Sequence, residues 1–176
     1  MQIEPSEEAF AARYLRGEAQ VVWTTLVADL ETPVSAFLKL GGGKAMSFLL
    51  ESVEGGAVRG RYSIIGLEPD LIWRSQHGAA SINRTARTRP DAFEACTERP
   101  LDALRGLIAE SRIALPDALP PMAAGVFGYL GYDMVREMEH LPADKPDPVG
   151  IPDAVMVRPT LIVVFDLTGT SSGPSS

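Results

Sequence analysis

This 176-residue sequence has very little cysteine, carries no net positive charge and contains no long apolar run. Cys96 is its single cysteine, so no internal disulfide can form and a cytosolic location is expected. The formal net charge is −7, whereas nucleic-acid binding requires a basic surface. No apolar run approaches the roughly 20 residues that cross a bilayer, and the acidic N-terminus lacks the apolar core of a signal peptide. We therefore expect a cytoplasmic protein with no nucleic-acid partner and no membrane partner.

Residues typical of metal sites are equally sparse. His77 and His140 lie far apart in the sequence, and no cysteine cluster accompanies them, which makes a zinc site improbable. Asp144, Asp147 and Asp153 lie in a proline-rich stretch, where solvated loop carboxylates are favoured over metal ligands. The cysteine has no adjacent partner that would mark it as a nucleophile. The sequence thus predicts no catalytic residue and no metal ligand.

Two glycine-rich segments resemble nucleotide-binding loops only superficially. The segment GGGK at 41–44 lacks the earlier glycine and the following Ser or Thr of a phosphate loop, which favours a helix end followed by a turn. Gly125, Gly128 and Gly131 are spaced three and three, whereas a dinucleotide fingerprint needs two and three. Neither segment predicts a nucleotide site.

What the sequence does contain is the composition of a packed globular domain, with 45% hydrophobic and 22% charged residues. We assign residues 1–167 to one domain. Residues 168–176, TGTSSGPSS, have nothing to bury and are expected to be a flexible linker or a vector-derived tail. Because this tail directly follows a strong strand candidate, we expect the chain to be a piece of a longer protein.

Helical and strand patterns follow one another without regular alternation. Helices are predicted at 7–16, 33–40, 100–113 and 132–139, from capping residues and helical spacing of apolar residues. Strands are predicted at 20–28, 45–53, 60–66, 70–75, 79–84, 122–131, 154–158 and 160–167, the last two separated by Pro159. Strands outnumber helices, which favours an α+β fold with a largely antiparallel sheet and flanking helices.

The densest group of polar side chains lies in residues 48–66, FLLESVEGGAVRGRYSIIG. Two apolar arms flank a glycine-bearing turn. The first arm carries Glu51 and Ser52, and the second carries Arg61, Tyr62 and Ser63. Such a hairpin could hold a small zwitterion. From the residues alone, solvent-exposed strand ends and an ion pair between Arg61 and Glu51 across the hairpin are favoured over a binding site.

At these residues the chain resembles a known family. LLESVEGG followed by GRYSIIG is similar to the N-terminal region of the large subunit of anthranilate synthase, component I. The resemblance includes DLETPVSAFLKL (29–40), AAGVFGYLGYDMVREME (123–139) and IPDAVMVRPTLIVVFD (151–166). It covers nearly all of residues 6–166 in the same order, and it implies part of a two-domain fold.

The resemblance implies a role in tryptophan biosynthesis. The full subunit of this family is a lyase that converts chorismate to anthranilate and pyruvate, with ammonia delivered by a glutamine amidotransferase subunit or domain. Chorismate and Mg²⁺ are bound by a C-terminal domain that this sequence does not contain. The chain is therefore expected to hold no cofactor and to be inactive by itself.

The resemblance also implies a regulatory site for tryptophan, the feedback inhibitor of this family. The residues that match it are Leu50, Glu51 and Ser52 on the first arm and Arg61, Tyr62 and Ser63 on the return arm. Glu51 would pair with the ammonium group, Ser52 or Arg61 would reach a polar end of the ligand, and the apolar neighbours would receive the indole ring. Residues outside this chain complete the family's pocket, so we expect this chain to bind tryptophan weakly or not at all.

Two alternatives remain open from the sequence. The chain also resembles, less closely, the N-terminal domain of aminodeoxychorismate synthase component I, in the folate pathway, where bound tryptophan would be structural. A stand-alone amino-acid-binding module is the other alternative, and it would need a complete pocket within the chain.

Overall fold

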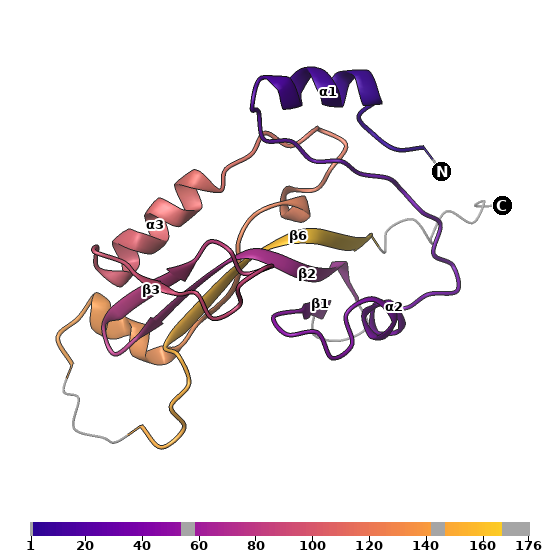
Figure 1. Ribbon diagram of the computed structural model, residues 1–176. Helices are drawn as coiled ribbons and strands as arrows, with labels where there is room; N and C mark the ends of the chain where they lie inside the picture. The colour runs from indigo at the N-terminus through magenta and orange to yellow at the C-terminus, as the bar shows by residue number, and fades with distance from the viewer. Residues whose placement is uncertain (1, 54–58, 142–146, 167–176) are drawn as a thin grey trace. The chain divides into compact units, whose positions relative to one another are not determined.

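The structure is a computed structural model that describes residues 2–53, 59–141 and 147–166 (Figure 1). Its helices are α1 (Glu7–Leu15), α2 (Pro33–Leu40) and α3 (Pro100–Glu110), with two 3-10 helices, η1 (Pro121–Ala123) and η2 (Tyr132–Glu137). Its strands are β1 (Phe48–Val53), β2 (Arg59–Gln76), β3 (Ala79–Asn83), β4 (Glu94–Ala95), β5 (Phe127–Leu130) and β6 (Ala154–Asp166). Every strand pair with a described register is antiparallel. The predicted α+β class is confirmed.

Local hydrogen bonds explain where the first two helices begin. The Ser6 hydroxyl accepts a hydrogen bond from the backbone N–H of Ala9, at the start of α1. At the start of α2, Thr32 and Ser35 form a reciprocal capping box, and Pro33 occupies the first turn. Both helices were predicted at these positions.

The chain forms two compact units. The first contains Met1–Leu67, Ile113–Ala124 and Leu161–Ser176, and the second contains Glu68–Arg112 and Gly125–Thr160. Strands β2 and β6 each contribute residues to both units. The strand order is β4-β3-β2-β6-β5, with β1 paired to β2.

The second unit holds the larger apolar core. Leu71 and Trp73 of β2 pack with Ala80 and Ile82 of β3, and α3 covers them. Leu104, Leu107, Met134 and Ala154 complete this core. The spacing of Leu104 and Leu107 places both on one face of α3, as the sequence predicts.

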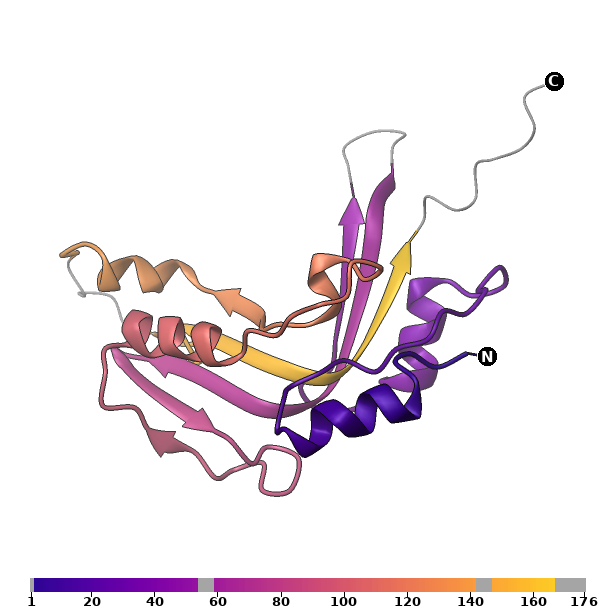
Figure 2. The same cartoon turned by 90° about the horizontal axis from the view of Figure 1, so that it is seen from above.

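The first unit is built on β1 and the beginning of β2. Figure 2 shows this part of β2 beside β1 and beside the end of β6. Ile65 and Leu67 are fully or almost fully buried. The ring of Phe48 lies over Gly66, directly opposite on β2, where a Cβ atom would overlap it. Glycine at position 66 therefore allows the aromatic ring to cover the strand.

The predicted strand at 20–28 is wrong. This segment forms a single isolated bridge, in which the backbones of Glu4 and Trp23 exchange two hydrogen bonds of 2.8 Å. Val22, Leu26 and Val27 are exposed. Residue types that favour strands do so through packing and burial, and this segment obtains little of either in the described part of the chain.

The expected break at Pro159 is also wrong, because β6 runs continuously from Ala154 to Asp166. Strand β5 pairs only with residues 154–157 of β6. Pro159 lies beyond that pairing, so the N–H that it lacks is not needed by β5.

Three other predicted strands differ in extent. Residues 60–66 and 70–75 are parts of the single strand β2, and the 122–131 segment is divided into η1 and β5. The short strand β4, which pairs with β3, was not predicted. Within the described ranges, none of the helices is both long and apolar enough to pass through a bilayer.

Candidate functional site

The predicted polar hairpin is formed by β1 and the beginning of β2. Leu50 lies opposite Ile64, and Glu51 lies opposite Ser63. Beyond this point the register shifts, because Val53 lies opposite Arg59. Ser52 therefore faces a stretch of three β2 residues, 60–62, which makes the hairpin irregular at the polar cluster. The predicted turn at 54–56 lies outside the described residues.

Strand alternation divides five of the six predicted site residues between two faces. Leu50 and Ile64 share one face, with Ser52 and Tyr62 two residues further along each strand. Glu51 and Ser63 alternate to the opposite face, where Ser63 is only 3% exposed, whereas Glu51 is exposed and still contributes to the pocket. The hairpin thus brings Leu50, Ser52 and Tyr62 together, and it places Ser63 in the interior behind them.

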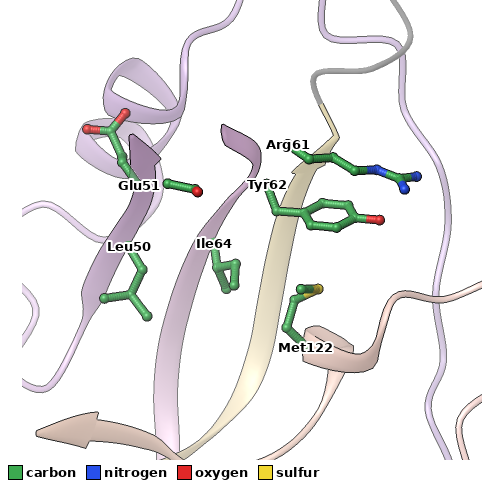
Figure 3. A pocket seen from close by; sticks show the side chains of 7 residues that line it. Leu50, Glu51, Arg61, Tyr62, Ile64 and Met122 are labelled. Atoms are coloured by element: carbon green, nitrogen blue, oxygen red, sulfur yellow. The ribbon is translucent and has the colours of Figure 1, made fainter. Parts of the chain in front are cut away.

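A pocket of about 430 Å³ lies on this hairpin (Figure 3). Its volume is within the range of small-molecule sites. The residues that line it are Leu50, Glu51, Ser52, Arg61, Tyr62, Ile64 and Met122. Five of the six predicted site residues therefore line one cavity.

Two lining residues were not predicted, Ile64 and Met122. Ile64 is adjacent to the RYS segment, and the strand period alone would have placed it beside Leu50. Met122 comes from η1, more than fifty residues further along the chain. No local sequence signal connects η1 to the hairpin, since only the tertiary fold brings them together.

Gly60 determines where the Ser52 side chain lies. A Cβ atom at position 60 would overlap both Oγ and Cβ of Ser52. Gly60 is buried, so a side chain there has no alternative space. The close approach of Ser52 to the β2 backbone therefore depends on glycine at this position.

We expect Gly60→Ala to displace Ser52 and to destabilise the hairpin by about 1–3 kcal/mol, the usual cost of inserting a methyl group into a filled space. Gly106→Ala in α3 is the matched control, because nothing lies within 4 Å of a Cβ atom there. That variant should be neutral or stabilising by up to about 1 kcal/mol. Urea unfolding of both variants measures the difference, and equal stabilities would contradict the close packing at Gly60.

Arg61 is paired with the end of β6 and not with Glu51. Its Nε and Nη2 donate hydrogen bonds of 3.2 and 3.0 Å to the two carboxylate oxygens of Asp166. This hydrogen bond to Asp166 raises the pKa of the already basic Arg61 side chain. The Arg61 guanidinium also lies 4.7 Å from the centre of the Tyr62 ring. The alternative in which Arg61 pairs with Glu51 is therefore not observed.

Glu51 is exposed and forms no ion pair with any described residue. Figure 3 shows its carboxylate directed away from the Arg61 guanidinium. A cationic group of a ligand near the first arm could therefore pair with the Glu51 carboxylate. An anionic group would have to compete with Asp166 for Arg61.

The pocket combines apolar walls with few polar groups. Leu50, Tyr62, Ile64 and Met122 present hydrophobic surface, and Ser52 adds a hydroxyl group. No group of three His, Cys, Asp or Glu residues that could hold a metal ion occurs in residues 2–53, 59–141 and 147–166. The arrangement suits the binding of a small amphipathic molecule, and the described residues that line the pocket include no nucleophile paired with a base.

Comparisons with known proteins relate most of this chain to one group of enzymes. Anthranilate synthase component 1 of Cereibacter sphaeroides is 53% identical over 161 residues, which are 92% of this chain and 32% of that protein. The protein of the same name from Thermus thermophilus is 42% identical over 142 residues, 81% of this chain and 29% of that protein. No protein-family model matches the chain.

A solved structure supports the same relationship at the level of the fold. The crystal structure of anthranilate synthase component I from Streptococcus pneumoniae aligns with a TM-score of 0.50 at 22% identity. The alignment covers 84% of this chain and 30% of that one. The chain therefore spans about a third of the length of the relatives that it matches.

Proposed function

The chain belongs to the anthranilate synthase component I family, whose N-terminal region it matches, and we propose that it is the regulatory N-terminal part of such an enzyme. The complete protein would convert chorismate to anthranilate for tryptophan biosynthesis. The observation that carries this proposal is the 53% identity along 92% of the chain.

The chemistry in this proposal takes place outside the chain. Chorismate and Mg²⁺ would be bound by the two thirds of the family's length that this chain does not span. The name component I implies a partner component, and we propose that this is a glutamine amidotransferase, as a subunit or a domain, that supplies ammonia.

The hairpin pocket would be part of a feedback site for tryptophan. Leu50, Tyr62, Ile64 and Met122 would receive the indole ring, since they form the apolar walls. Glu51 would pair with the ammonium group, and the Ser52 hydroxyl would form a hydrogen bond with the ligand.

The remaining two predicted residues would act less directly. Arg61 is held by Asp166 and would contribute to the wall beside Tyr62. Ser63 is buried on the opposite face of β2 and would support the strand from behind. Residues beyond this chain would supply the partner for the ligand's carboxylate.

We expect this 176-residue chain to form no anthranilate from chorismate, ammonia and Mg²⁺, and to show no saturable tryptophan binding below about 1 mM, an affinity equivalent to roughly 4 kcal/mol. The pocket is open and lacks a free cation for the ligand carboxylate among its lining residues. Anthranilate fluorescence and isothermal titration calorimetry are the measurements, and the intact protein is the control, expected to be active and inhibited by tryptophan.

Three outcomes would contradict this assignment in different ways. Micromolar binding to the isolated chain would favour a stand-alone amino-acid-binding module. An intact protein that forms aminodeoxychorismate would place the chain in the folate pathway. If the intact protein forms anthranilate but is not inhibited by tryptophan, only the proposed regulatory role is refuted.

A further inference from the structure

A chain of three side chains connects the end of β6 to the wall of the pocket. Asp166 accepts two hydrogen bonds from Arg61, which lies 105 residues earlier in the sequence. Arg61 in turn lies over the ring of Tyr62, with its guanidinium carbon 4.7 Å from the ring centre. Tyr62 is half-buried and lines the pocket. All three residues belong to the first unit.

The geometry fixes a side chain that would otherwise be mobile. An arginine has many rotamers, and a contact between its guanidinium and an aromatic ring needs a defined position. The two parallel hydrogen bonds to Asp166 select one orientation of the planar guanidinium. Asp166 thus controls the position of Arg61 without lining the pocket itself.

We propose that Asp166 is a positioning residue of the tryptophan pocket, because it holds Arg61 over Tyr62 and thereby fixes the ring that forms one wall. This inference rests on the proposed function, which supplies the ligand. Arg61 then acts as a brace for Tyr62, and it is not the partner of the ligand's carboxylate.

Because the ion pair between Arg61 and Asp166 is exposed, its effect on the pocket can be measured apart from its effect on stability. The Arg61 and Asp166 side chains are 57% and 42% exposed. Ion pairs in such surroundings contribute little to stability, because water already solvates both charges. Removing the Asp166 charge should therefore leave the unfolding midpoint almost unchanged while it loosens the pocket wall.

The test uses the intact protein that contains this region, with L-tryptophan as the inhibitor and each variant normalised to its own uninhibited rate. Asp166→Asn is expected to raise the tryptophan concentration for half-inhibition by about three- to fivefold, the factor that corresponds to an exposed cation–π contact. Asp166→Glu should restore most of the affinity, since it returns the charge.

Asp70→Asn is the matched control. Asp70 holds Arg158 by the same two-bond arrangement, at 2.9 and 2.8 Å, in the second unit. Neither residue lines the pocket. The control should lose an ion pair without changing the sensitivity to tryptophan.

A double-mutant cycle with Tyr62→Leu shows whether Asp166 acts through the ring. In the Tyr62→Leu background, Asp166→Asn should produce no further loss, because no ring remains to be positioned. An equal loss in both backgrounds, or no loss in either, would overturn the proposal. If Ser52→Phe relieves inhibition but Asp166→Asn does not, this inference alone fails, whereas an unaltered protein that tryptophan does not inhibit overturns both proposals.

Discussion

Replacing Ser52 by phenylalanine in the intact protein is expected to raise the tryptophan concentration for half-inhibition by at least about 100-fold, equivalent to roughly 2.7 kcal/mol. Ser52 contacts the β2 backbone so closely that a Cβ atom at Gly60 would overlap it. A phenyl ring has no space on that side, and when directed into the pocket that Ser52 lines it fills that pocket. The ring would occupy the volume proposed for the indole. Anthranilate formation measured against tryptophan concentration gives the result.

Two comparison variants separate blockage of the pocket from other effects. Ser52→Ala removes the hydroxyl and keeps the space, so the loss should be limited to about 1 kcal/mol, the typical value of one hydrogen bond. Ser81→Phe introduces the same ring on β3 in the second unit, at a residue that does not line the pocket, and should leave inhibition unchanged. Full inhibition of the Ser52→Phe protein at the original tryptophan concentration would refute the site.

The sequence predicted the features of the fold that depend on neighbouring residues. Ser6 and Thr32 mark the two helix starts because their hydroxyl groups bond to backbone N–H groups three residues later. The turn between β2 and β3 likewise depends on adjacent residues, because His77 and Gly78 adopt positive φ angles of 51° and 76°.

Features that depend on distant partners were missed. Residues 20–28 have strand-forming side chains, but the tertiary structure gives them a single bridge to Glu4. Pro159 breaks no strand, because β5 has already ended beside Val157. In both segments, the missing information was the identity of the neighbouring strand and where it stops.

In the functional site, too, the residues of a local motif were predicted and those contributed by distant segments were missed. The resemblance identified Leu50 and Ser52 by their local motif, and both line the pocket. Met122 and Asp166 lie far along the chain from β1, and no periodicity links them to it. The motif also did not predict the register shift opposite Ser52, because the shift depends on how β1 and β2 pair.

Replacing Trp73 by alanine is expected to destabilise the chain by about 3–5 kcal/mol, the usual cost of truncating a buried tryptophan. Its side chain is fully buried among Leu71, Leu104 and Leu107. The surrounding β2 and α3 backbones limit how far the cavity can collapse. This loss is a large part of the stability of a typical domain. Urea unfolding followed by circular dichroism measures it.

Trp23→Ala is the matched control, because the Trp23 bridge to Glu4 uses backbone atoms that alanine retains. The Trp23 side chain is only partly buried, so the variant should cost less than Trp73→Ala. Trp73→Phe separates the contribution of the ring's volume from that of its polar Nε1 atom. The Trp73 Nε1 atom is buried and has no hydrogen-bond partner among the described residues, so phenylalanine loses volume but also removes an unpaired polar group. We therefore expect Trp73→Phe to cost much less than Trp73→Ala, and equal costs would mean that Nε1 has a bonded partner whose loss offsets the retained packing.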